Sequence, residues 1–119
     1  MVSYGGYYEC GSSLQWLKTA LAPNISYGGL DKLAENITRG SNGLLFAPYL
    51  SGERHLHSDS FARGSFVGMT LRHNLAHMTR SVLEGVAFSL CDILELLRSL
   101  DVNPEAIMIS GGAANSTLW

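Results

Sequence analysis

The chain has 119 residues, 46% of them hydrophobic, and a formal net charge of −2 at pH 7. This length suits one domain of ordinary size with a real core. Lysines and arginines are scattered, which argues against a nucleic-acid partner or an anionic-membrane patch. No apolar run approaches the ~20 residues that a membrane span requires, so no membrane partner is expected. The two cysteines, Cys10 and Cys91, come without a secretion signal and indicate reduced thiols in a cytoplasmic protein.

The first third of the chain predicts a strand followed by two helices. Residues 2–9 alternate loosely and carry three tyrosines, which favours a strand. A helix then opens at Ser12 or Ser13, one of which is expected to cap it, and closes before Pro23. The apolar faces of the two helices are Leu14, Leu17, Ala20 and Leu21 in the first, and Leu30, Leu33, Ala34 and Ile37 in the second.

The remaining elements alternate between strands and helices. Residues 44–50 form a continuous apolar run, long enough for a buried strand. Residues 51–63 are polar and predict a long surface loop. Residues 106–109 are apolar without alternation, which is typical of a parallel strand covered on both faces. A glycine turn and the start of another helix follow. This alternation predicts an α/β layer fold.

The dominant element is a helix over residues 74–100. Its apolar residues recur at steps of three and four, which is the repeat of one helix face. Asn74 is the expected N-cap, and Pro104 forces an end before it. Gly85 costs roughly 1 kcal/mol relative to alanine, so we expect another backbone to pass close to it. The stripe consists of Leu75, Met78, Val82, Val86, Leu90, Ile93, Leu97 and Leu100, widened by Leu83, Ala87 and Leu94.

The strongest chemical signal is the turn Gly111-Gly112-Ala113 between a predicted strand and a predicted helix. Glycines let backbone amides approach a phosphate, and a helix N-terminus adds favourable partial charge. Asn115 and Ser116 can add side-chain contacts. The alternative is a tight turn that needs glycine only for its dihedral angles, and spacing alone favours that alternative.

The histidines and the charged loop are weaker signals. His73 and His77 are four residues apart, but an N-cap at Asn74 would leave His73 outside the helix, so no tight metal site is predicted. All four histidines are instead expected to be solvated, His55 and His57 in the loop and His73 and His77 at the helix end. The loop that carries Glu53, Arg54, Asp59 and Arg63 has two readings that composition does not separate: a salt-bridge network that holds its shape, or a lip over a ligand cleft.

Several spaced motifs together resemble the C-terminal domain of the FGGY carbohydrate kinases. Residues 45–54 read Leu-Phe-Ala-Pro-Tyr-Leu-Ser-Gly-Glu-Arg, and His57 follows. The other matching segments, in the same order as in the family, are residues 62–64, 68–70, 76–77, 80–87 and 111–113. The resemblance covers the chain from about Leu44 to the end and weakly includes residues 11–17. It is far more specific than the glycine turn alone.

The resemblance implies a partial ribonuclease-H-like, actin-like ATPase domain of the α/β class, with helices packed on a mixed sheet. Residues 1–119 would be part of the C-terminal, nucleotide-binding domain, and the N-terminal sugar-binding domain would be absent. ATP with Mg²⁺ and a small sugar are the implied ligands. Gly111, Gly112, Ala113, Asn115 and Ser116 inherit the nucleotide contacts. The aspartate that acts as general base would lie upstream, so no catalytic residue is expected in this chain.

Two departures and two alternatives accompany this resemblance. The family's Arg-Thr-Pro-His is replaced by residues 54–57, Arg-His-Leu-His, and its common third glycine by Ser110. We expect a piece of a longer protein, because Trp119 ends the chain where a helix is starting. The competing class is a non-enzymatic interaction module built on the long helix, against which the width of the stripe argues. A homodimer stays open.

Overall fold

The computed structural model describes residues 11–53 and 58–119. Its helices are α1 (Ser12–Leu21), α2 (Tyr27–Glu35) and α3 (Leu75–Ser99), with short 3₁₀ turns η1 (Ser41–Gly43) and η2 (Gly112–Asn115). Its strands are β1 (Leu45–Ala47) and β2 (Ser65–Val67). The strand predicted over residues 2–9, and with it Arg54, His55 and His57, lies outside the described residues.

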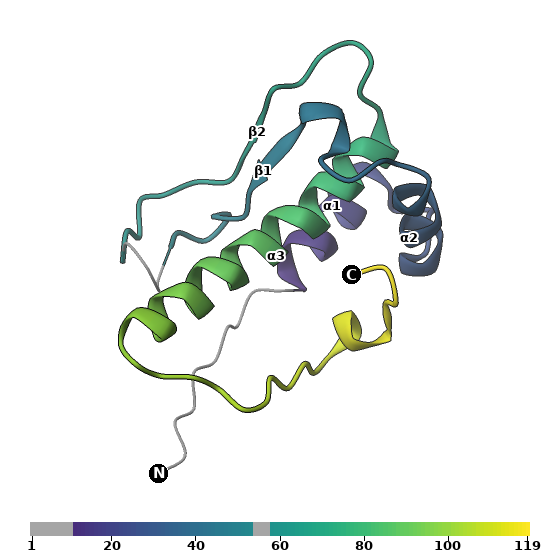
Figure 1. Ribbon diagram of the computed structural model, residues 1–119. Helices are drawn as coiled ribbons and strands as arrows, with labels where there is room; N and C mark the ends of the chain where they lie inside the picture. The colour runs from purple at the N-terminus through teal and green to yellow at the C-terminus, as the bar shows by residue number, and fades with distance from the viewer. Residues whose placement is uncertain (1–10, 54–57) are drawn as a thin grey trace.

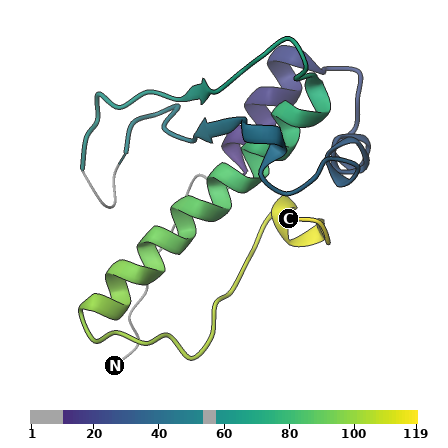
Figure 2. The ribbon, with the colours of Figure 1, turned by 45° about the horizontal axis from the view of Figure 1, so that its top comes forward.

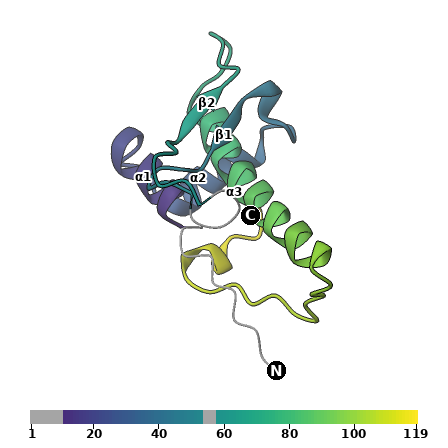
Figure 3. The same cartoon turned by 90° about the vertical axis from the view of Figure 1, so that its left-hand side faces the viewer.

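The helix α3 organises the described part of the chain, as the sequence predicts. It contacts β1, α2, α1 and η1. Figure 1 shows α1, α2 and the β1–β2 hairpin gathered around its N-terminal part, and Figure 3 shows its C-terminal end projecting away from them. After α3 the chain turns back as an irregular segment toward the middle of the helix (Figure 2). None of the helices in the described ranges has the length and apolar character needed to cross a bilayer.

The predicted start of α3 and the role of Gly85 are both confirmed. The Asn74 side-chain oxygen accepts hydrogen bonds from the amides of Ala76 and His77 at 3.0 and 3.4 Å. The His77 side chain accepts in return from the Asn74 amide at 3.2 Å, which completes a capping box. A Cβ added at Gly85 would overlap the Phe46 carbonyl oxygen, so β1 crosses the helix at backbone distance.

The core lies between α1, α2, β1 and the N-terminal half of α3. Leu17, Leu30, Ala34, Val82 and Val86 are fully buried there. Two predicted features of the small helices are wrong. Gly11 occupies the N-cap of α1 without a side-chain cap, because Ser12 and Ser13 already lie inside the helix. Leu21 and Ala20 are exposed, since nothing in the described chain covers that side of α1.

The sheet is smaller than the sequence predicts. Residues 44–50 form only the three-residue strand β1, which pairs antiparallel with β2 in the register Leu45↔Val67 and Ala47↔Ser65. Pro48, which directly follows β1, has no amide hydrogen to donate to a ladder. The two paired strands are the whole sheet among the described residues, so no mixed sheet is present there.

The buried strand expected over residues 106–109 is also wrong for the described chain. Ile107, Met108 and Ile109 are 64%, 91% and 66% exposed, and the segment makes no ladder with β1 or β2. A strand needs a neighbouring strand for its backbone groups, and neither described strand pairs with residues 106–109. The α/β class itself holds, because helices and a small sheet share one core.

Candidate nucleotide-binding site

The glycine turn is formed as a tight turn at Gly111. Its φ of +83° and ψ of −166° are accessible to glycine and strained for other residues. Two short-range bonds close the turn: the Ala114 amide donates to the Gly111 carbonyl at 3.2 Å, and the Ser116 amide to the Ala113 carbonyl at 3.1 Å. The positive φ of the turn therefore explains why residue 111 is a glycine.

Neither backbone conformation nor close packing explains why residue 112 is also a glycine. A Cβ added at Gly112 would meet no described atom within 4 Å, and Gly112 lacks a positive φ. Gly112 and Asn115 are exposed, while Ala113 and Ser116 are half-buried. The surface above Gly112 is thus open to a ligand, which is the property that close approach of a phosphate requires.

The helix expected after the turn is not an α-helix. Residues Gly112–Asn115 form one 3₁₀ turn, and residues 117–119 continue without helical structure. Among the described residues, no long helix begins at the turn to add its partial positive charge. Within residues 111–119, the groups that can attract a phosphate are the local backbone amides and the Asn115 and Ser116 side chains.

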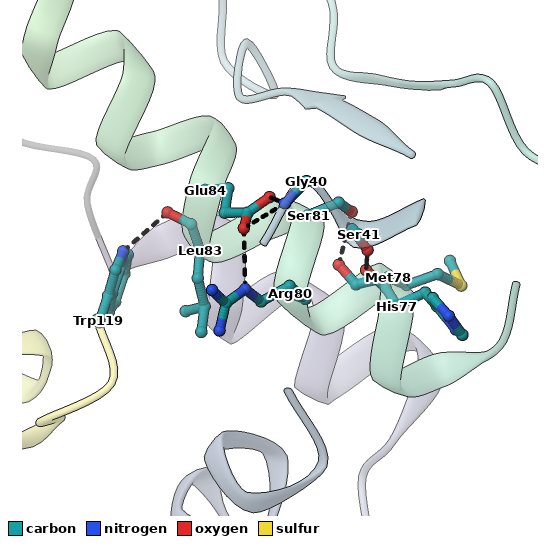
Figure 4. A network of polar contacts seen from close by, with 9 residues as sticks. All are labelled: Gly40, Ser41, His77, Met78, Arg80, Ser81, Leu83, Glu84 and Trp119. Carbon is teal, nitrogen blue, oxygen red and sulfur yellow. Dashed lines mark hydrogen bonds and ion pairs between the residues drawn. The ribbon is translucent and has the colours of Figure 1, made fainter. Parts of the chain in front are cut away.

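The turn is tied to α3 through the residues that follow it, as Figure 4 shows for Trp119. The Trp119 indole N–H donates to the Leu83 carbonyl at 3.0 Å, and the Trp119 amide donates to Ser116 Oγ at 3.1 Å. Leu118 and Trp119 pack against the core cluster. They line, with α3, a small groove of about 70 Å³ whose other walls are Arg80, Leu83, Glu84 and Ala87. Sequence reasoning missed this anchor, because the hydrogen bond joins residues 36 positions apart.

A second polar link holds the segment before β1 on the same stretch of α3 (Figure 4). Glu84 accepts from Arg80 Nε at 2.9 Å and from the Gly40 amide at 3.0 Å. Ser41 Oγ donates to the His77 carbonyl at 2.6 Å. Gly40 and Ser41 both have positive φ, so this sharp turn needs such fixed partners. Arg80 and Glu84 belong to the segment that carried the family resemblance, and here their observed role is structural.

The histidines of the described chain also have structural partners. His73 lies outside α3, as predicted, and its Nδ1 accepts from the Thr70 amide at 2.8 Å. Its Nε2 is 3.1 Å from the Asn42 carbonyl. His77 is only 8% exposed, which corrects the expectation of a solvated helix-end histidine. In residues 11–53 and 58–119, no three His, Cys, Asp or Glu side chains come together as metal ligands.

Within its described part, the charged loop is held by its own backbone. The Glu53 amide donates to the Asp59 carbonyl at 2.8 Å, and Glu53 Oε2 accepts from the Ser58 amide at 3.0 Å. Arg63 donates to the carbonyls of Ser60 and Ala62. These contacts are hydrogen bonds to backbone groups that hold the shape of the loop. They do not test the predicted salt-bridge network or the ligand-lip reading, and both stay predictions.

Residues 2–119 match the sequence pattern of the FGGY family of carbohydrate kinases, C-terminal domain. The chain belongs to this family. Curated relatives include a xylulose kinase of Bacillus subtilis strain 168, which is 43% identical over 109 residues, covering 92% of this chain and 22% of the relative. A gluconokinase of the same organism is 43% identical over 94 residues, covering 78% of this chain and 18% of the relative.

A solved structure supports the same assignment. The xylulose kinase of Rhodospirillum rubrum superimposes with a TM-score of 0.82 at 35% sequence identity, covering 92% of this chain and 22% of that chain. The expected α/β, actin-like fold class and the family are therefore confirmed. The chain spans about a fifth of the length of the relatives that it matches.

Proposed function

We propose that this chain is part of the C-terminal, nucleotide-binding domain of an ATP-dependent sugar kinase that phosphorylates D-xylulose. The observation that carries the proposal is the identity to xylulose kinases along nearly the whole chain. Gluconate is the second candidate substrate, because gluconokinases match the chain over a shorter stretch. The helix-mediated interaction module loses support, since the N-terminal half of α3 is covered by this chain's own elements.

In the proposed reaction, an aspartate in the upstream part of the kinase takes the proton of a sugar hydroxyl. The hydroxyl oxygen then attacks the γ-phosphorus of ATP, and ADP leaves. Catalysis of phosphoryl transfer rests on positioning and on charge stabilisation. The contribution proposed for this chain is positioning of the nucleotide by Gly111, Gly112, Ala113, Asn115 and Ser116.

The openness above Gly112 supports this role, because a backbone without a Cβ lets phosphate oxygens reach the amides. Ser116 Oγ already accepts from the Trp119 amide, and its hydroxyl hydrogen can still donate to an anion. The described residues do not form a cage of carboxylates for Mg²⁺. Mg²⁺ is accordingly proposed only as the companion of the ATP phosphates. A cytoplasmic location and a small sugar substrate complete the proposal, and the homodimer stays open.

The substrate is tested on the full-length kinase that carries this segment. We expect ATP-dependent phosphorylation of D-xylulose, with a kcat/KM at least tenfold above that for D-gluconate. The 119-residue chain alone should give no turnover above the no-enzyme background, because the proposed base lies outside it. A preference for gluconate would replace the substrate, and turnover by the chain alone would contradict the fragment interpretation.

The nucleotide site is tested by two neighbouring glycines. Gly112→Ala should leave the melting temperature nearly unchanged, because its Cβ points into open space. It should nevertheless raise the KM for ATP, since the same Cβ would stand in the path of a phosphate. Gly111→Ala is the matched control and should lower stability by roughly 1 kcal/mol or more through its positive φ. An unchanged ATP affinity in folded Gly112→Ala would remove this turn from the nucleotide site.

A further inference from the structure

The glycine turn has few contacts of its own that would fix its position. Its two backbone hydrogen bonds join residues within the turn, from Gly111 to Ala114 and from Ala113 to Ser116. Neither Gly111 nor Gly112 has described atoms within 4 Å of an added Cβ. These bonds set the shape of the turn, but its placement relative to α3 has to come from elsewhere.

Leu118 and Trp119, which follow the turn, both pack against the core cluster, and Trp119 also makes hydrogen bonds to both sides. One end of this residue holds Ser116, because its amide donates to Ser116 Oγ at 3.1 Å. The other end holds α3, because its indole N–H donates to the Leu83 carbonyl at 3.0 Å (Figure 4). The ring also forms one wall of the groove along Leu83 and Ala87. Trp119 thus connects the last residue of the turn directly to the helix.

The point of attachment lies in the buried, N-terminal half of α3. Leu83 is 3% exposed. Its neighbour Glu84 is tied to Gly40 and Arg80, and Gly85 lies against the Phe46 carbonyl. A group that is hydrogen-bonded to the Leu83 carbonyl is therefore held at a fixed place relative to the core.

We propose that Trp119 is a positioning residue for the nucleotide: its indole N–H, bonded to the Leu83 carbonyl, holds the glycine turn where it meets the phosphates of a nucleoside triphosphate. This inference rests on the proposed function of the turn. Trp119 itself need not touch the ligand. Loss of its N–H frees the turn from α3. The turn then has to become ordered when the nucleotide binds, and this lowers the affinity for the nucleotide.

The test is Trp119→Phe in the full-length kinase, which keeps an aromatic ring in the groove and removes the N–H. The KM for ATP and the dissociation constant of ADP should rise about 3–10-fold, the amount expected for one hydrogen bond. The KM for the sugar should stay within twofold. The matched control is Trp16→Phe, the same chemical change at a ring that packs on Phe66, 6.4 Å between centroids. It should leave both KM values unchanged.

An ATP KM that stays unchanged in folded Trp119→Phe would overturn the proposal, as would an equal rise in the sugar KM. If Trp119→Phe melts below the assay temperature, ADP affinity is measured on Trp119→Tyr, and an unchanged value there also overturns it. Failure of the proposed function of the turn would look different, because Gly112→Ala would then also leave the KM for ATP unchanged, whereas failure of the Trp119 proposal alone leaves the Gly112→Ala effect in place.

Discussion

The two halves of α3 carry one continuous apolar stripe in very different surroundings. In residues 75–86 the helix is covered by α1, α2, β1 and η1, and it contains all seven of its buried residues. In residues 87–99 every side chain is exposed or half-buried, and Phe88 is 56% exposed. The apolar stripe therefore predicts which face of the helix needs to be buried. It does not predict which segment buries that face.

The covered half also contains polar residues that the stripe does not predict. Thr79 and Ser81 are buried, at 0% and 1% exposure. Each hydroxyl donates to a carbonyl of its own helix, Thr79 to Leu75 and Ser81 to Met78, both at 2.8 Å. Small hydroxyl residues that satisfy themselves in this way let α1, α2 and η1 approach without leaving unpaired polar atoms.

The largest expected contrast between the halves is between Leu83→Ala and Leu90→Ala. Leu83 is buried, so Leu83→Ala should lower the free energy of unfolding by about 3 kcal/mol. Leu90 is half-buried and should cost about 1 kcal/mol. The apolar stripe taken without the structure predicts that Leu90→Ala also lowers the free energy of unfolding by about 2–5 kcal/mol. Urea unfolding of the two purified variants measures the difference, and equal losses would break the comparison.

Gly85→Ala tests the backbone contact that fixes the covered half. Alanine should gain about 1 kcal/mol from helix propensity. Its Cβ would meet the Phe46 carbonyl, which belongs to the backbone and cannot move aside cheaply. We expect a net loss of about 2 kcal/mol by urea unfolding. Glu95→Ala in the exposed half is the control and should stay within about 0.5 kcal/mol. A stabilised Gly85→Ala variant would mean that β1 does not cross there.

Asn74→Ala tests the cap that begins the covered half. It removes the oxygen that accepts from the Ala76 and His77 amides, and should cost about 1 kcal/mol. Thermal unfolding followed by circular dichroism measures the loss. The control is Asn103→Ala, at an exposed asparagine beyond the end of α3, which should change stability by less than about 0.5 kcal/mol. Equal effects at the two sites would remove the cap from the explanation of where α3 begins.

Local rules predicted α3 well because its signals are local. The N-cap Asn74, the three/four repeat and Gly85 each act within a few residues or on one passing backbone. The strand over residues 106–109 failed because a strand depends on neighbours, and its own residues say nothing about whether they are present. Pro48 likewise shortened β1 to three residues, although the apolar run continues past it.

The candidate site was predictable only where its features depend on neighbouring residues in the sequence. The glycine requirement at Gly111 follows from the dihedral angles of a turn, which sequence can indicate. The attachment through Trp119 joins residues 36 positions apart, and no local pattern predicts such a pair. Sequence assigned the turn to the nucleotide through the family resemblance, and that assignment stays a prediction.

The smallest expected effect is at the exposed segment after α3. Met108 is 91% exposed, so Met108→Lys should change the stability of this chain by less than about 0.5 kcal/mol. Leu71→Lys is the control, because Leu71 is also fully exposed, at 106%, and lies in a loop that the sequence never predicted to be a strand. Urea unfolding of both variants should give the same midpoint as the parent chain.

The apolar pattern of residues 106–109 makes the opposite prediction, since a lysine in a strand covered on both faces buries a charge at a cost of several kcal/mol. A loss above 2 kcal/mol for Met108→Lys in this chain would contradict the exposure seen in the structure. The same pair of variants in a full-length kinase tests whether residues outside this chain cover residues 106–109. If Met108→Lys destabilises the long protein and Leu71→Lys does not, the segment is covered there by residues outside this chain. If neither does, the segment is a surface loop in both, and the apolar pattern alone was misleading.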